Sequence, residues 1–102
     1  MRKPPPDGYR AVMRLAEVRP ELLALAVAVA AQAVAAESFG GKFPGAWALE
    51  RLPHGGRPDH GLRTLVAYGV LERAPRTGPG TRPALYRVPD LAGVRRALAE
   101  LG

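Results

Sequence analysis

The chain has 102 residues, which is room for one domain with one core and leaves no space for a separate catalytic domain. Hydrophobic residues make up 47% and charged residues 24% of it, so most of the chain is expected to fold rather than stay disordered. A formal net charge of +6 favours polyanionic partners, nucleic acid first, and the lack of cysteine excludes disulfides, a thiolate nucleophile and a zinc ribbon. A cytoplasmic location is the simplest interpretation.

The chain starts with a basic pair and three prolines, which predict a flexible basic arm over residues 1–6. A single domain is expected over residues 7–102. Asp7 can cap a first helix that ends near Arg19. The apolar face of this helix is expected to consist of Tyr9, Val12, Met13 and Ala16.

A long apolar helix is expected next, from about Pro20 to Glu37, because proline suits the first turn of a helix and Glu21 suits its positive end. Residues 22–31 contain no polar side chain. The run is nevertheless shorter than the roughly 20 strongly apolar residues of a membrane span. It therefore predicts a central helix that is packed on several sides, with no membrane partner.

Residues 38–45 are glycine-rich and are expected to break this helix, with Phe39 and Phe43 available to anchor a loop or short strand to the core. A third short helix follows, in which Ala46, Leu49 and Leu52 repeat at helical spacing, and residues 53–56 close it with a turn. Trp47 and Tyr86 are expected in the core, because a chain with so few aromatic residues needs them there.

Residues 58–69 have a strongly amphipathic pattern. Leu62, Leu65, Val66 and Gly69 fall at i, i+3, i+4 and i+7 and are expected to face inward. His60, Arg63 and Thr64 must then face outward. Gly69 is expected to end the helix, because a left-handed conformation costs glycine nothing. Gly61 weakens the helix and has two explanations, close packing or close approach to DNA.

Two strand-like runs, residues 70–74 and 84–88, flank a loop of turn formers and arginines and predict a hairpin. Asp90 can cap a last helix with an apolar stripe opposite the exposed pair Arg95 and Arg96. The stripe consists of Leu91, Val94, Leu98 and Leu101. The expected fold class is therefore mainly α with a small β-hairpin, that is, α+β.

Residues 61–73 contain a leucine-spaced helix that ends in Gly-Val-Leu-Glu-Arg, and residues 84–88 read Ala-Leu-Tyr-Arg-Val. This combination resembles the winged helix-turn-helix regulators of bacteria and archaea, which implies about five helices and a wing of two or three strands. The resemblance covers residues 43–88, flanked by helices within 7–37 and 90–101. It implies that helix 58–69 enters the major groove of duplex DNA and that wing 71–88 lies on the backbone or in the minor groove.

The DNA contacts that the resemblance and the charge pattern favour are Arg57, His60, Arg63, Thr64, Arg76, Thr77 and Arg82. Arg63 is the expected base reader, because a guanidinium can bond guanine O6 and N7 together. These residues predict a transcriptional regulator that binds double-stranded DNA. A homodimer is expected, since one helix and one wing make few base contacts, and the first or the last helix would supply its surface.

Other functions stay open. The chain could be a winged-helix protein–protein interaction module in a larger complex, an RNA or single-strand binder that stacks bases on Trp47 or Tyr86, or a ligand of acidic membranes. An enzyme is not expected, because Ser38 is the only serine and the carboxylates are scattered. No cofactor and no small-molecule substrate is indicated. No metal site is expected, since His54, Asp59 and His60 have no fixed ligand geometry.

Overall fold

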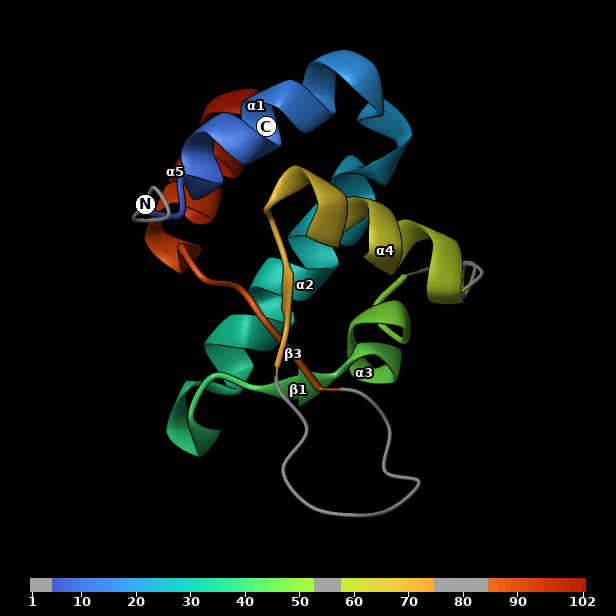
Figure 1. Ribbon diagram of the computed structural model, residues 1–102, viewed down its shortest axis with the longest axis vertical. Helices are drawn as coiled ribbons and strands as arrows, with labels where there is room; N and C mark the ends of the chain where they lie inside the picture. The colour runs from blue at the N-terminus through green and yellow to red at the C-terminus, as the bar shows by residue number, and fades with distance from the viewer. Residues whose placement is uncertain (1–4, 53–57, 75–84) are drawn as a thin grey trace, which may run out of the picture.

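The computed structural model describes residues 5–52, 58–74 and 85–102, with the side chains of all these residues except Phe39, Pro58, Asp59 and His60. They form a mainly helical body with a small antiparallel sheet of three strands (Figure 1). This arrangement confirms the expected α+β class. The three strands are the larger of the two expected numbers, and the third strand comes from the glycine-rich segment.

The first helix, α1, spans Gly8–Val18. Its predicted cap is confirmed, because the side chain of Asp7 accepts a hydrogen bond from the backbone N–H of Arg10 at 3.0 Å. The predicted apolar face is confirmed in part, because Val12 is fully buried and Tyr9 and Met13 pack against the core, but the most buried side of the helix is centred one position earlier. The residues of α1 that are buried are Gly8, Ala11, Val12 and Leu15. Helix α5 packs along α1 and comes close to its backbone at Gly8, so α1 buries the face that contains this glycine.

The predicted helix from Pro20 to Glu37 consists of three pieces: the 3-10 helix η1 (Pro20–Leu22), the α-helix α2 (Leu23–Ala35) and the 3-10 helix η2 (Glu37–Phe39). Helix α2 runs through the middle of the molecule and contacts α1, α3, α4 and α5 (Figure 1). This confirms the prediction of a central helix packed on several sides. Within the described ranges, no helix has the length and apolar character needed to cross a membrane.

Strand β1 (Phe43–Pro44) and helix α3 (Gly45–Leu49) follow the glycine-rich segment. Phe43 is fully buried, so its predicted role as an anchor is confirmed. The strand pairs with β3 (Leu85–Arg87), which in turn pairs with β2 (Glu72–Arg73), giving the order β1-β3-β2. Both pairings are antiparallel, and Tyr86 of β3 lies between Phe43 and Arg73 in register.

Helix α4 spans Pro58–Tyr68 and ends at Gly69, whose φ of +87° confirms the predicted left-handed end. Helix α5 spans Leu91–Leu101 and begins at the predicted cap, since Asp90 accepts a hydrogen bond from the N–H of Gly93 at 3.2 Å. Arg95 and Arg96 are exposed as predicted. The apolar stripe of α5 does not reach the end of the chain, because Leu101 is 44% exposed.

Candidate nucleic-acid interface

Helix α4 is rotated by about one residue from its predicted orientation. Leu62 and Leu65 are buried as expected, but Val66 is 37% exposed, and Gly69 is exposed as well. Gly61 is buried in their place. The outward face of α4 therefore carries Arg63, Val66 and Ala67, all exposed, and the prediction that Val66 turns inward was wrong.

The cause of this rotation is the contact between α4 and the central helix. A Cβ on Gly61 would lie 2.6 Å from Cδ2 of Leu25, far inside van der Waals contact. The absent side chain lets α4 approach α2 along this glycine, and the helix turns to bury it. Of the two explanations for Gly61, close packing is the one that the contact supports.

Arg63 is exposed on the outward face of α4, as predicted. It forms no ion pair with any residue of the described ranges. Thr64 is half-buried, so its side chain is less accessible than the pattern indicated. His60 belongs to α4, but its side chain is outside the described part of the structure.

The two predicted strands after Gly69 do pair, and the hairpin they form lies directly after α4 in the chain. The expected DNA contacts Arg57, Arg76, Thr77 and Arg82 lie outside the described residues. Their roles stay predictions. Among the described side chains, Arg63 is the predicted DNA contact that is exposed, and its helix directly precedes the base of the predicted wing in the chain.

Two further arginines belong to this hairpin and were missed by the sequence analysis. Arg73 of β2 is exposed. Arg87 of β3 donates hydrogen bonds from Nε and Nη2 to one carboxylate oxygen of Glu72, at 3.1 and 3.0 Å. The cross-strand register places Glu72 opposite Arg87, so a hairpin alignment of the two runs could have found this pair. Glu72 partly neutralises Arg87 and leaves Arg73 as the more available cation.

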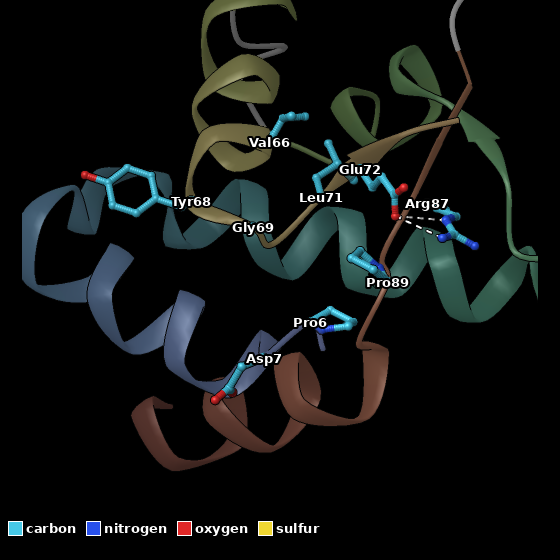
Figure 2. A pocket seen from close by; sticks show the side chains of 9 residues that line it. All are labelled: Pro6, Asp7, Val66, Tyr68, Gly69, Leu71, Glu72, Arg87 and Pro89. Carbon is cyan, nitrogen blue, oxygen red and sulfur yellow. Dashed lines mark hydrogen bonds and ion pairs between the residues drawn. The ribbon is translucent and has the colours of Figure 1, made fainter. Parts of the chain in front are cut away.

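A hollow of about 470 Å³ lies between the end of α4, the hairpin and the segment before α1 (Figure 2). Leu71 is buried beside it, and the ion pair of Glu72 and Arg87 lies at one end. Pro6 and Pro89 lie close together across from this pair. The first described residues therefore start next to the hairpin, and the basic residues Arg2 and Lys3 precede this point in the sequence.

Trp47 does not lie in the core. It is 50% exposed, although its neighbours Ala48 and Leu49 in α3 are buried. The prediction was wrong because a helix of five residues has one buried side, and in α3 that side consists of Gly45, Ala48 and Leu49. Tyr86 is half-buried and packs against the core, as expected, with its ring over Gly45, where a Cβ would lie 3.0 Å from Cε2.

The resolved pKa shifts concern residues away from α4 and the hairpin. A hydrogen bond to Glu100 raises the pKa of Tyr9. The hydrogen bond between Arg19 and Glu21 raises the pKa of the arginine and lowers that of the glutamate. The bond of Tyr9 to Glu100 links α1 to α5, whereas Arg19 and Glu21 form a local contact at the point where α1 ends and η1 begins. Among the described side chains, no cluster of three or more histidines and carboxylates is arranged to hold a metal ion.

Around the central helix α2 the described elements follow the order α1, β1, α3, α4, the β2–β3 hairpin and α5. This arrangement is an α+β fold of a winged-helix-like class. Its outward features are the exposed face of α4 and the hairpin beside it. Comparisons of this chain with protein-family models, with curated proteins and with solved structures find no match.

Proposed function

We propose that this chain binds duplex DNA, with the outward face of α4 in the major groove and the hairpin on the adjacent backbone or minor groove. The observation that carries the proposal is the exposure of Arg63 without an ion-pair partner in the described ranges, on α4, the helix that directly precedes the β2–β3 hairpin in the chain. A guanidinium in that position can bond O6 and N7 of a guanine together.

The charge of the chain supports the same proposal. The net charge of +6 attracts a polyanion, and each phosphate contact releases counterions. Exposed arginines lie on both parts of the proposed interface, Arg63 on α4 and Arg73 on β2. The protein would act as a transcriptional regulator in the cytoplasm. A homodimer would double the number of base contacts, and α1 and α5 offer Val18 and Leu101 as exposed apolar residues for its surface.

The test is fluorescence anisotropy of a labelled duplex, titrated with the protein at several salt concentrations. The duplex is first selected from random sequences, and a scrambled duplex serves as the comparison. We expect the dissociation constant to rise steeply with salt. Arg63→Ala should weaken binding to the selected duplex by about tenfold or more and reduce the preference over the scrambled one.

The matched control is Arg95→Ala, which removes an equally exposed arginine from α5. It should leave the preference between the two duplexes unchanged. Binding that is undetectable or indifferent to salt would overturn the proposal, as would equal effects of the two substitutions. Arg57, His60, Thr64, Arg76, Thr77 and Arg82 belong to the same proposal, and Arg82→Ala should weaken binding to both duplexes equally, as expected for a phosphate contact.

A further inference from the structure

A second polar hollow lies on another part of the molecule, between α2 and the end of α3. It has a volume of about 310 Å³ and is lined by Gln32, Trp47, Glu50 and Arg51, which together we call the Trp47 hollow. Trp47, Glu50 and Arg51 are spaced i, i+3 and i+4 on one side of α3 and the turn that continues it. All three are exposed, and Trp47 presents half of its surface.

The guanidinium of Arg51 is held in place by the central helix. Its Nε donates a hydrogen bond to Oε1 of Gln32 at 2.9 Å. Gln32 is the only polar residue of α2 and is 8% exposed. A buried amide in an apolar helix is costly unless it is hydrogen-bonded, so this bond fixes the direction of both side chains.

Arg51 has further hydrogen-bond donors on its two Nη atoms. Within residues 5–52, 58–74 and 85–102, no carboxylate forms an ion pair with Arg51, although Glu50 is its neighbour in the chain. The hollow therefore holds an oriented cation, a carboxylate acceptor and a half-exposed indole. Among the described residues that line it, Trp47 supplies the one apolar side chain, which is poor support for an apolar peptide.

We propose that the Trp47 hollow binds a nucleotide with an unpaired base. The base would stack on the indole of Trp47, the phosphate would bond to the Nη atoms of Arg51, and Glu50 would accept a hydrogen bond from an N–H on the edge of the base. A cationic ligand would also suit an exposed tryptophan, and it would be attracted by Glu50 as well as repelled by Arg51. The choice of a nucleotide therefore rests on the oriented guanidinium of Arg51 as a hydrogen-bond donor to phosphate, and a purely cationic ligand serves as the comparison in the test.

This inference does not depend on the duplex interface, because Gln32, Trp47, Glu50 and Arg51 lie on α2 and α3 rather than on α4 or the hairpin. The nucleotide could be free or could be an unpaired residue in a strand. Both sources share the same chemistry, a planar base and a phosphate. In a duplex the bases are stacked on each other, so a blunt duplex offers no face to Trp47 except at its ends.

The experiment uses the fluorescence of Trp47, which is the only tryptophan of the chain. The full chain is titrated separately with guanosine 5′-monophosphate, with a short single-stranded oligonucleotide and with a blunt duplex of the same sequence. We expect saturable quenching by the mononucleotide or the single strand at concentrations where the blunt duplex quenches little. Saturation by the mononucleotide assigns the hollow to free nucleotides, and saturation by the single strand alone assigns it to unpaired residues of a strand.

Variants separate stacking from general attraction. Arg51→Ala should raise the concentration for half-quenching by about fivefold or more, because it removes the donors to the phosphate, while Arg95→Ala should leave it unchanged. For Trp47→Ala, binding is followed by anisotropy of the labelled ligand and should weaken about fivefold to hundredfold. Trp47→Phe keeps an aromatic face and should bind more tightly than Trp47→Ala, and circular dichroism checks that each variant is folded.

The failure of this inference is distinguishable from the failure of the duplex proposal. Arg63→Ala should leave the quenching of Trp47 unchanged, and Trp47→Ala should leave blunt-duplex binding unchanged. Absence of saturable quenching by both probes would overturn the inference. So would quenching that Arg51→Ala does not weaken, equal quenching by the blunt duplex, or equal quenching by choline as a purely cationic ligand.

Discussion

The side chain of Asp90 accepts a hydrogen bond from the backbone N–H of Gly8 at 2.8 Å, which joins the start of α1 to the start of α5. The other carboxylate oxygen of Asp90 accepts from the N–H of Gly93 at 3.2 Å and caps α5. One side chain therefore satisfies N-terminal N–H groups of two helices that lie side by side (Figure 1). This link holds the two flanking helices together over the core.

Asp90→Ala should destabilise the chain more than a substitution that removes the cap of a single helix. It removes the cap of α5 and leaves the N–H of Gly8, a buried residue, without its partner. We expect the free energy of unfolding to fall by about 2–4 kcal/mol, the sum of a lost cap and an unsatisfied donor. The measurement is urea denaturation. Asp7→Ala removes a cap that serves α1 alone and should cost less, so equal losses would contradict the double role of Asp90.

Gly8→Ala tests how closely α1 and α5 approach. A Cβ on Gly8 would lie 2.5 Å from the carbonyl oxygen of Asp90 and 2.7 Å from Cγ2 of Val94. The carbonyl belongs to the backbone and cannot move without shifting α5. We expect a loss of about 2–3 kcal/mol in thermal or chemical unfolding. Gly40→Ala, where there is open space but φ is +83°, should show only the smaller cost of a left-handed alanine. A Gly8→Ala variant as stable as the parent would refute the close contact.

Gly61→Ala tests the cause of the rotation of α4. Alanine improves helix propensity by about 1 kcal/mol, but its Cβ would overlap Leu25 in the core. We expect no gain, or a loss of about 1 kcal/mol, in the free energy of unfolding. In a Leu25→Ala background the overlap is gone, and the same substitution should be stabilising by about 1 kcal/mol. A gain in both backgrounds would show that Gly61 does not pack on Leu25.

Glu72→Gln should strengthen duplex binding if the hairpin lies on DNA. The substitution removes the carboxylate that partly neutralises Arg87, so this cation becomes available to a phosphate. We expect a lower dissociation constant. The slope of its logarithm against the logarithm of the salt concentration should become steeper by up to about one, which corresponds to one additional counterion released. Arg73→Ala should make the salt dependence of the dissociation constant less steep, because it removes a cation from the hairpin. If neither substitution changes the salt dependence, the hairpin does not contact DNA, whatever the role of α4.

Tyr9→Phe should reveal a pH-dependent link between α1 and α5. The hydroxyl of Tyr9 donates a hydrogen bond to Glu100, which raises the pKa of the phenol, and the guanidinium of Arg96 lies 4.6 Å from the centre of the ring. A raised pKa means that the neutral phenol stabilises the fold below its unfolded pKa and that this contribution is lost as pH rises through the folded pKa. Tyr9→Phe should therefore be less stable than the parent at neutral pH.

The difference between the two proteins should shrink as the pH rises through the raised pKa of Tyr9 in the folded state, where the phenol ionises and the parent loses the hydrogen bond. Equilibrium unfolding at a series of pH values measures it. Phenylalanine keeps a ring for Arg96, so the comparison isolates the hydroxyl. A difference that stays constant through the alkaline range would mean that the bond to Glu100 contributes nothing to stability.

Contacts within a few residues were determined by the sequence alone. Asp7 and Asp90 cap the helices that follow them, Gly69 ends α4 with a positive φ, and two strands pair after it. The exposure of Arg63 was predicted for the same reason, since it lies between Leu62 and Leu65 on a helix. Capping, chirality and helical period act over one or two turns, so they can be read without knowledge of the partners of a helix.

The tertiary structure alone decided which of two adjacent faces each helix buries. Val66 is exposed and Gly61 buried because Leu25 of the central helix needs the space that a glycine leaves. Trp47 is exposed because Gly45, Ala48 and Leu49 form the buried side of the short helix α3. Moving the buried face of a helix by one residue fits the hydrophobic periodicity of its sequence almost equally well. The move changes which side chains contact the neighbouring helix, and the face that packs better depends on residues far away in the chain.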